Sequence, residues 1–260
     1  MQHEPERLAE LGYITRWLHN TEVIVPPVCM VPGGEFLMGS SSFDDPDAAA
    51  DERPRHRVSV GAFAIMRFPV TVAEYACFTR VGGEPAGEQE SQWRAADHPE
   101  TRVTWGEAAA YARWLSAVTG LRWRLPTEAE WEKAARWDAA ADLARIYPWG
   151  GRFETGRCNT RESGRNGTSP VGEYPDGASP VGAEEMAGNV WEWTSSIARA
   201  YPYHAEDGRE VPDEYARHVL RGGSWQYDAH SARAACRFSQ VAGGSLLDVG
   251  FRLICDAATA

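Results

Sequence analysis

The stretch that most constrains this chain is the run from Arg221 to Arg252, RGGSWQYDAHSARAACRFSQVAGGSLLDVGFR. Three blocks in it join small or apolar residues to arginine. They are RGGSW (221–225), RAACR (233–237) and VGFR (249–252). The triplets between the blocks follow neither the period of a strand nor that of a helix. They are QYD (226–228), FSQ (238–240) and LLD (246–248). This pattern predicts a rigid frame, formed by the blocks, that carries interchangeable side chains.

The triplets mix aromatic, aliphatic, amide and acidic side chains, a composition that favours a contact surface over a core. Tyr227 and Phe238 offer large contact areas at small entropic cost, and polar neighbours add directional contacts. We therefore predict a binding face for an unknown protein or small-molecule ligand. Its residues are Gln226, Tyr227, Asp228, His230, Phe238, Gln240, Leu246, Leu247 and Asp248. A position partly within the core is the alternative for the two leucines.

Composition limits the class of protein. Hydrophobic content of 43% and charged content of 24% are those of an ordinary globular chain. The 11 tryptophans, 25 glycines and 16 prolines predict large rings buried beneath long irregular segments. A formal net charge of −11 argues against nucleic acid as a partner, because no basic stripe is present to neutralise phosphates.

Cysteine usage and hydropathy bear on the compartment. The five cysteines are odd in number, widely spaced and never arranged as CxxC, so we predict reduced core thiols. No charged start followed by an apolar run announces a signal peptide, and no apolar run approaches the roughly 20 residues of a membrane-spanning helix. We therefore expect a cytoplasmic protein without a membrane partner.

The chain divides into two parts. Residues 1–24 predict a short helix and a strand, or a linker from a larger protein, and residues 25–260 form the main domain. Within that domain, residues 40–53 are acidic and predict an exposed loop. Residues 57–65 alternate as one half-buried strand does, whereas residues 150–182 lose both periods and predict long loops.

Three helix starts are marked by threonine with glutamate three residues later. They are Thr71 with Glu74, Thr104 with Glu107, and Thr127 with Glu130. In this capping box the threonine hydroxyl accepts from the third amide of the helix, and the glutamate carboxylate accepts from the amide of the threonine itself, which satisfies two bare donors. The second helix is expected to end at Gly120, since glycine is a favoured C-terminal cap.

Six motifs now occur together in a recognisable order. They are VPGGEF (31–36), PVT (69–71), RLPTEAEWE (124–132), AGNVWEW (187–193), RGGSW (221–225) and GFR (250–252). With them the chain resembles the formylglycine-generating enzyme, or sulfatase-modifying factor, family from about Pro27 to Asp256. The resemblance implies an α+β fold, namely that family's variant of the C-type lectin fold, as one compact domain with little regular secondary structure.

The resemblance fails at the family's catalytic site. Formylglycine-generating enzymes carry two cysteines shortly after the RGGSW-like motif, which bind copper as thiolates and oxidise a substrate cysteine with O₂. Here residues 226–232 contain no cysteine, and Cys236 lies within the RAACR block. We expect no copper, and catalysis of that kind is in doubt. Cys236 is interpreted as a small buried thiol, with a surrogate nucleophile as the alternative.

The resemblance also implies a structural calcium ion at the AGNVWEW motif. The family's ligand positions correspond to Glu185, Gly188, Val190 and Glu192 in this chain, the two middle ones through backbone carbonyls. Carboxylate and carbonyl oxygens are the ligands that Ca²⁺ prefers. In the alternative interpretation Glu192 pairs with an arginine and Glu185 is solvated.

Three functions remain open. The variable proteins of diversity-generating retroelements resemble this chain in the same C-terminal frame, which implies a ligand-binding module whose variable region lies near 225–249. Targeted diversification changes chosen codons, so it would leave altered triplets between unaltered frame blocks. The alternative is a family metalloenzyme with altered chemistry and a pocket near Trp225 and His230, or the second half of an iron sulfoxide synthase, although no HxxxH pair is present. The third is a sensor domain fused to a larger effector.

Overall fold

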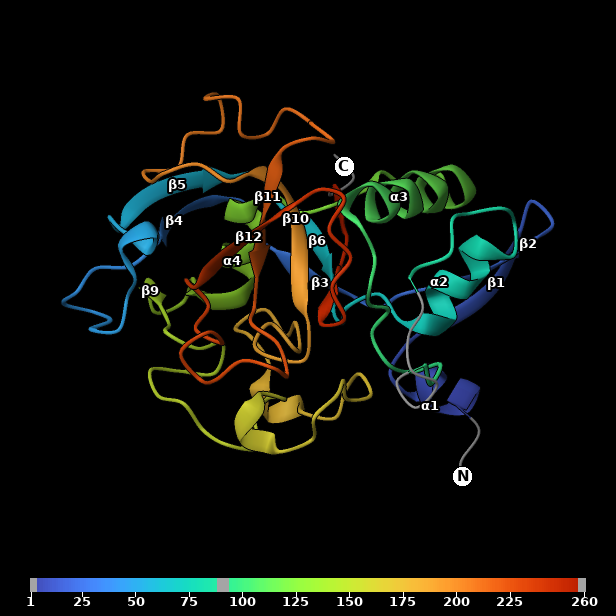
Figure 1. Ribbon diagram of the computed structural model, residues 1–260, viewed down its shortest axis with the longest axis horizontal. Helices are drawn as coiled ribbons and strands as arrows, with labels where there is room; N and C mark the ends of the chain where they lie inside the picture. The colour runs from blue at the N-terminus through green and yellow to red at the C-terminus, as the bar shows by residue number, and fades with distance from the viewer. Residues whose placement is uncertain (1–3, 88–93, 257–260) are drawn as a thin grey trace.

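A computed structural model describes residues 4–87 and 94–256. Two four-stranded sheets and three two-stranded ribbons form its framework, and four helices pack around them (Figure 1). The helices are α1 (Glu4–Glu10), α2 (Val72–Thr79), α3 (Trp105–Thr119) and α4 (Glu128–Arg136). Helices and mostly antiparallel strands are thus mixed, with only β10 and β13 parallel among the described strand pairs, and the α+β class predicted from the sequence is confirmed.

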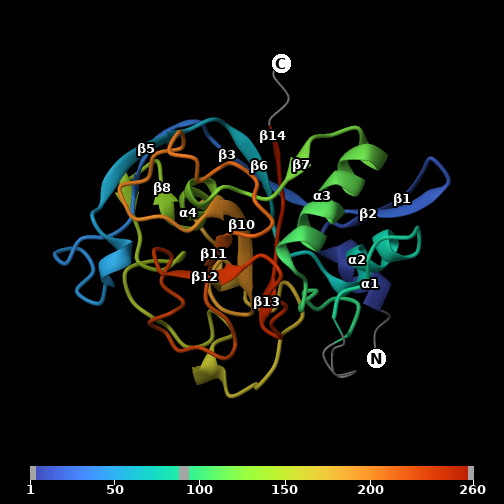
Figure 2. The same cartoon turned by 45° about the horizontal axis from the view of Figure 1, so that its top comes forward.

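The first four-stranded sheet has the order β12-β11-β10-β13, and the second has the order β3-β6-β14-β7. The strands of the first are β10 (Trp191–Ile197), β11 (Arg217–Arg221), β12 (Arg237–Val241) and β13 (Val249–Gly250). The strands of the second are β3 (Val28–Val31), β6 (Phe63–Met66), β7 (Trp123–Arg124) and β14 (Ile254–Asp256). Helix α3 lies beside β7 and β14 (Figure 2). The frame blocks therefore supply strands to the first sheet, where β12 is an edge strand.

The three ribbons are β1 (Ile14–Leu18) with β2 (Thr21–Val25), β4 (Gly34–Met38) with β5 (His56–Val60), and β8 (Trp137–Asp138) with β9 (Leu143–Ala144). The single strand predicted over 57–65 is wrong. Gly61 and Ala62 separate β5 from β6, which pair in different sheets. The N-terminal segment forms α1 and a hairpin, one strand more than expected, and its boundary at residue 24 stays a prediction.

All three predicted capping boxes are confirmed. The hydroxyls of Thr71, Thr104 and Thr127 accept from the third helical amide, and the glutamate carboxylates accept from the threonine amides. Gly120 ends α3 in the left-handed conformation, with φ of 72°. The long loop predicted over 150–182 is also confirmed, since its only regular elements are 3₁₀ turns at Arg161–Ser163 and Pro175–Gly177.

The main core lies between α2, α3 and the two larger sheets, and it includes the rings of Tyr75, Tyr111, Trp193 and Phe251. A second cluster lies under α4 around Trp131. Every residue of α4 is buried, including its charged ones. No described helix is long and apolar enough to cross a membrane.

Candidate functional site

Three arginines of the frame blocks, Arg221, Arg233 and Arg252, are buried, and each binds one or two carboxylates from a distant part of the chain. The Nη2 atom of Arg221 donates to Glu128 and Glu132 of α4 at 2.8 Å each and to the hydroxyl of Tyr201 at 2.7 Å. Its Nη1 atom donates to the carbonyls of Ala234 and Cys236. Arg221 thereby joins two blocks of the frame to one helix.

Arg233 binds the acidic segment 40–53. Its Nη1 atom donates to Asp45 at 2.6 Å and to Glu52 at 2.8 Å, and its Nη2 atom donates to the other oxygen of Glu52 at 2.7 Å. Both carboxylates are buried. The prediction that this segment is simply an exposed loop is therefore wrong at these two residues, because a buried guanidinium requires anionic partners.

Arg252 completes the set. It contacts both carboxylate oxygens of Glu192 at 2.7 Å, and the indole nitrogen of Trp131 donates to the same group at 2.7 Å. A carboxylate that accepts three such bonds has little capacity left for a metal ion. As placed, Glu192 does not fit a calcium ligand, and the alternative interpretation of an arginine pair is the one observed.

Glu185 behaves differently. It is buried without an ion pair to any residue in the described ranges, and burial raises the pKa of its carboxyl group to about 8. Its two oxygens accept from the amide of Gly172 and from the side chain of Asn189. A buried carboxylate without a cation fits a calcium ligand. Nowhere in 4–87 and 94–256 could three or more His, Cys, Asp or Glu side chains hold a metal ion together.

The first loop of the binding face, residues 226–230, is fixed through its backbone. Arg161 donates to the carbonyl of Gln226 at 3.1 Å through Nε and to that of Tyr227 at 2.8 Å through its amide. The amide of Ala229 donates to Glu162 at 2.9 Å, and its carbonyl accepts from the hydroxyl of Tyr147 at 3.0 Å. These contacts hold the loop whatever side chains stand at 226 and 227.

Two of the triplets meet around one tryptophan. The rings of Tyr227 and Phe238 lie 5.6 Å and 5.8 Å from that of Trp191, measured between centroids. Phe238 is 40% exposed, while Tyr227 is half-buried against the core. Trp191 is buried, and its indole nitrogen has no hydrogen-bond partner among the described residues. The sequence did not single out Trp191, because spacing alone does not tell which tryptophan of the WEW motif lies beneath the face.

The other residues predicted for the binding face differ in their exposure to solvent. His230 and Leu246 are exposed, and Gln226, Asp228, Gln240 and Leu247 are half-buried. Asp248 is only 4% exposed, and its carboxylate accepts from the hydroxyl of Ser224 at 2.6 Å. Its placement on the binding face is therefore wrong, since this side chain ties the LLD triplet to the RGGSW block.

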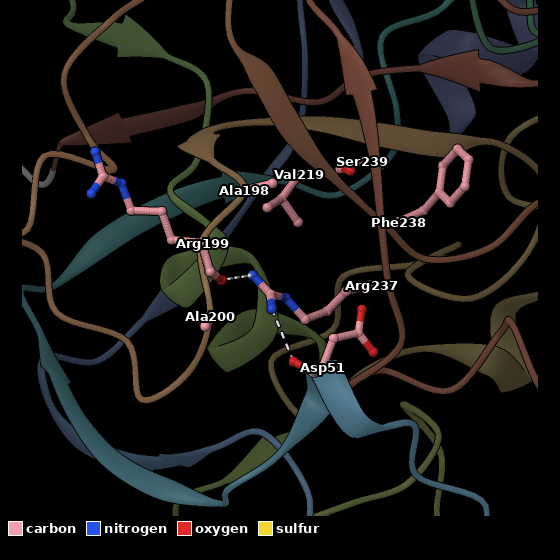
Figure 3. Close-up of a pocket in the computed structure, with 8 residues that line it drawn as sticks. All are labelled: Asp51, Ala198, Arg199, Ala200, Val219, Arg237, Phe238 and Ser239. Carbon is pink, nitrogen blue, oxygen red and sulfur yellow. Dashed lines mark hydrogen bonds between the residues drawn. The ribbon is translucent and has the colours of Figure 1, made fainter.

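A cavity of about 320 Å³ opens beside Phe238 (Figure 3). Arg237 and Ser239 of β12 form one wall, and residues 198–200 and Asp51 form the others. Arg237 donates to the carbonyls of Arg199 and Asp51 at 2.9 Å each, and it also binds Glu128. The guanidinium therefore belongs to the wall, while the partly exposed Phe238 side chain lines the cavity beside it.

Cys236 belongs to the RAACR block. It is buried, and desolvation raises the pKa of its thiol to about 12. The thiol is protonated at neutral pH and is a poor nucleophile. This observation favours the interpretation as a small core residue over that of a surrogate for the absent cysteine pair.

The fold is that of a C-type lectin-like scaffold. Treponema denticola variable protein 1 has the same fold, with 20% identity, a TM-score of 0.68 and coverage of 94% of this chain and 99% of that one. The family described as "Sulfatase-modifying factor enzyme 1-like domain" matches residues 17–257. The chain belongs to this family of formylglycine-generating enzyme-like domains.

Two other relatives show its breadth. PvdO from Pseudomonas aeruginosa is 28% identical, with a TM-score of 0.76 and coverage of 89% of this chain and 94% of that one. The hercynine oxygenase of Mycolicibacterium smegmatis is 36% identical over 240 residues, which cover 75% of this chain and 53% of the relative. The chain thus spans about half the length of the hercynine oxygenases that it matches.

Proposed function

We propose that this chain is a ligand-binding module whose contacts are made by the side chains of the binding face other than Asp248. The observation that carries the proposal is the division of labour in the C-terminal run. Arg221, Arg233 and Arg252 fix the frame by buried ion pairs, and backbone contacts fix residues 226–229. Side chains such as Gln226 and Phe238 are left for contact with a ligand.

The finer proposal is that the chain is the variable protein of a diversity-generating retroelement. Backbone anchoring supports it, because codons on the face can then change without a cost in folding. The test is to read the neighbouring DNA for a reverse transcriptase and a near-copy of the 3′ coding region. Differences at adenines confined to codons of the binding face other than Asp248 are expected, and differences spread equally over the frame codons contradict the proposal.

Binding itself is tested with a displayed library of random peptides panned against the purified chain. We expect selected peptides to lose binding to F238S and Q226A but to keep it for R16M, a variant of an exposed arginine of β1 in the N-terminal hairpin. Contact side chains dominate such interfaces, with losses of about 1 kcal/mol or more. Peptides that bind all variants equally contradict the face as the binding site.

A second candidate, catalysis within an oxygenase, rests on the 36% identity with a hercynine oxygenase over 240 residues. It predicts O₂ uptake that depends on hercynine when Fe²⁺ is supplied to the purified chain. The binding-module proposal predicts no uptake, and no conversion of a sulfatase-type cysteine peptide to an aldehyde with copper and O₂. Turnover in either assay contradicts the binding-module proposal.

Two further properties belong to the proposal. A calcium ion would be held by Glu185 and the carbonyls of Gly188 and Val190, without Glu192; it would neutralise a buried charge and fix the adjoining loop. A cytoplasmic location is supported by five cysteines that are all free thiols. Fractionation of the native cell tests the location, and the calcium experiment is given below.

A further inference from the structure

A second cavity lies away from the binding face, between the N-terminal segment and α2. The elements that line it, α1, β1, β2 and α2, are at the right of Figure 1. Its volume is about 630 Å³, within the range of small-molecule sites. Its walls come from α1, the β1–β2 hairpin, α2 and residues 94–96. Four separate segments therefore enclose it.

Small side chains on opposed walls leave this space open. Ala9 of α1, Ala73 and Ala76 of α2, and Ala96 all line it, while Tyr13 adds an apolar wall. The walls are also held in place. The ring of Tyr13 stacks on that of Phe68, with centroids 6.0 Å apart, and Arg7 of α1 donates to the carbonyl of Val171 at 2.8 Å. The N-terminal segment is thus a fixed wall of the cavity.

The charged groups at the rim are two arginines and one glutamate. Arg80 forms an ion pair with Glu22, which neutralises it. Arg94 lines the same cavity, is exposed, and has no ion pair with any residue that the structure describes. Burial raises the pKa of Glu100 and the charge of Arg94 acts to lower it, but the two side chains form no salt bridge with each other. A guanidinium is therefore open to an anion at the edge of an apolar chamber, in a chain whose net charge is −11.

We propose that this cavity binds an amphiphilic monocarboxylate, with its aliphatic or aromatic body among the alanines and its carboxylate at Arg94. Apolar walls remove the body from water, and the arginine selects an anionic head group over a neutral or cationic one. The cavity shares no residue with the binding face, so the site stands independently of the proposed function.

Three probes with the same apolar chain and different head groups test the proposal: decanoate, decanol and decyltrimethylammonium. Their affinities for the purified chain are measured by isothermal titration calorimetry below the critical micelle concentrations. We expect decanoate to bind best, about threefold tighter than decanol, a difference of the size of one exposed ion pair. Absence of binding by decanoate, or equal binding of all three probes, overturns the proposal.

Two variants test whether decanoate binds in this cavity. A76L fills the cavity and is expected to weaken decanoate binding about tenfold, the usual size of an overpacking effect. Its matched control is A109L, at a half-buried alanine of α3 remote from this cavity. R94Q, at an exposed position, keeps the fold and is expected to abolish the preference for decanoate over decanol. Unchanged binding by A76L, or an unchanged preference in R94Q, contradicts the assignment.

Discussion

Replacement of Arg221 by methionine, a side chain of similar length without charge, tests the frame most severely. Arg221 is fully buried and neutralises Glu128 and Glu132, which are themselves buried. The substitution leaves both carboxylates in α4 with fewer cations. Glu128 keeps Arg237, and Glu132 keeps Arg136 at 3.2 Å, so the loss is partial.

Removing one partner of a buried ion pair destabilises a protein by about 3–5 kcal/mol, and the remaining arginines place R221M near the lower end. A loss of about 3 kcal/mol lowers the melting temperature by roughly 6–12 °C in a chain of this size. Burial alone raises the pKa of Glu128, but Arg221 and Arg237 hold it below its usual value. The stabilisation that these arginines give to Glu128 is present at pH values above the pKa of Glu128 in the unfolded chain. It is lost as the pH falls through the lower pKa that Glu128 has in the folded chain.

The assay is urea unfolding of the native chain, R221M and R217M at pH 8 and at pH 4. Arg217 lies on the same strand but is exposed, so R217M is expected to cost no more than about 0.5 kcal/mol. The deficit of R221M should shrink at pH 4, because protonation relieves the unpaired carboxylates. Equal stability of R221M and R217M at pH 8 refutes the reasoning.

Further predictions concern the glutamate and glycine positions around the frame. Because burial raises the pKa of Glu185 to about 8, this group should lower the unfolding free energy by about 2–4 kcal/mol as the pH rises from 5 to 8. E185Q should remove that share of the slope, while the shares of Glu74, with a pKa of about 8, and Glu100, with a pKa of about 7, remain. The melting temperature of the native chain at pH 8 should be higher with excess calcium than with a chelator, whereas that of E185Q should be the same in both. Identical melts of the native chain in the two conditions exclude the ion. Gly223 has a φ of 73°, and an added Cβ would lie 2.8 Å from the carbonyl of Ser231, so G223A should cost about 1–3 kcal/mol; an unchanged melt contradicts this.

Local signals in the sequence predicted the helices well. A capping box is complete within four residues, so Thr71, Thr104 and Thr127 marked three helix starts that the structure confirms. The family resemblance predicted the fold as well, because its motifs cover nearly the whole chain. The strand over 57–65 failed because Gly61 and Ala62 change the sheet while the alternation of side chains continues.

The long-range ion pairs could not be predicted from spacing. Arg233 and Glu52 are separated by 181 residues, and nothing local indicates that they meet. One signal was present: Glu128 and Glu132 stand four residues apart, and that spacing places both on one side of a helix. Asp248 was assigned to the binding face because the LLD triplet lacks a period. Its bond to Ser224 appears only when β13 and the RGGSW block are brought together.

The central claim is that a rigid frame carries exchangeable contact residues, and a substitution library tests it most directly. Each of Gln226, Phe238, Leu246, Arg221 and Arg233 is replaced by all other residues in the displayed chain, and the folded fraction is measured by protease resistance. The account predicts that most substitutions at the first three positions leave the protease resistance of the chain unchanged, while nearly all at the two arginines lower it. Equal intolerance at both sets of positions would contradict it.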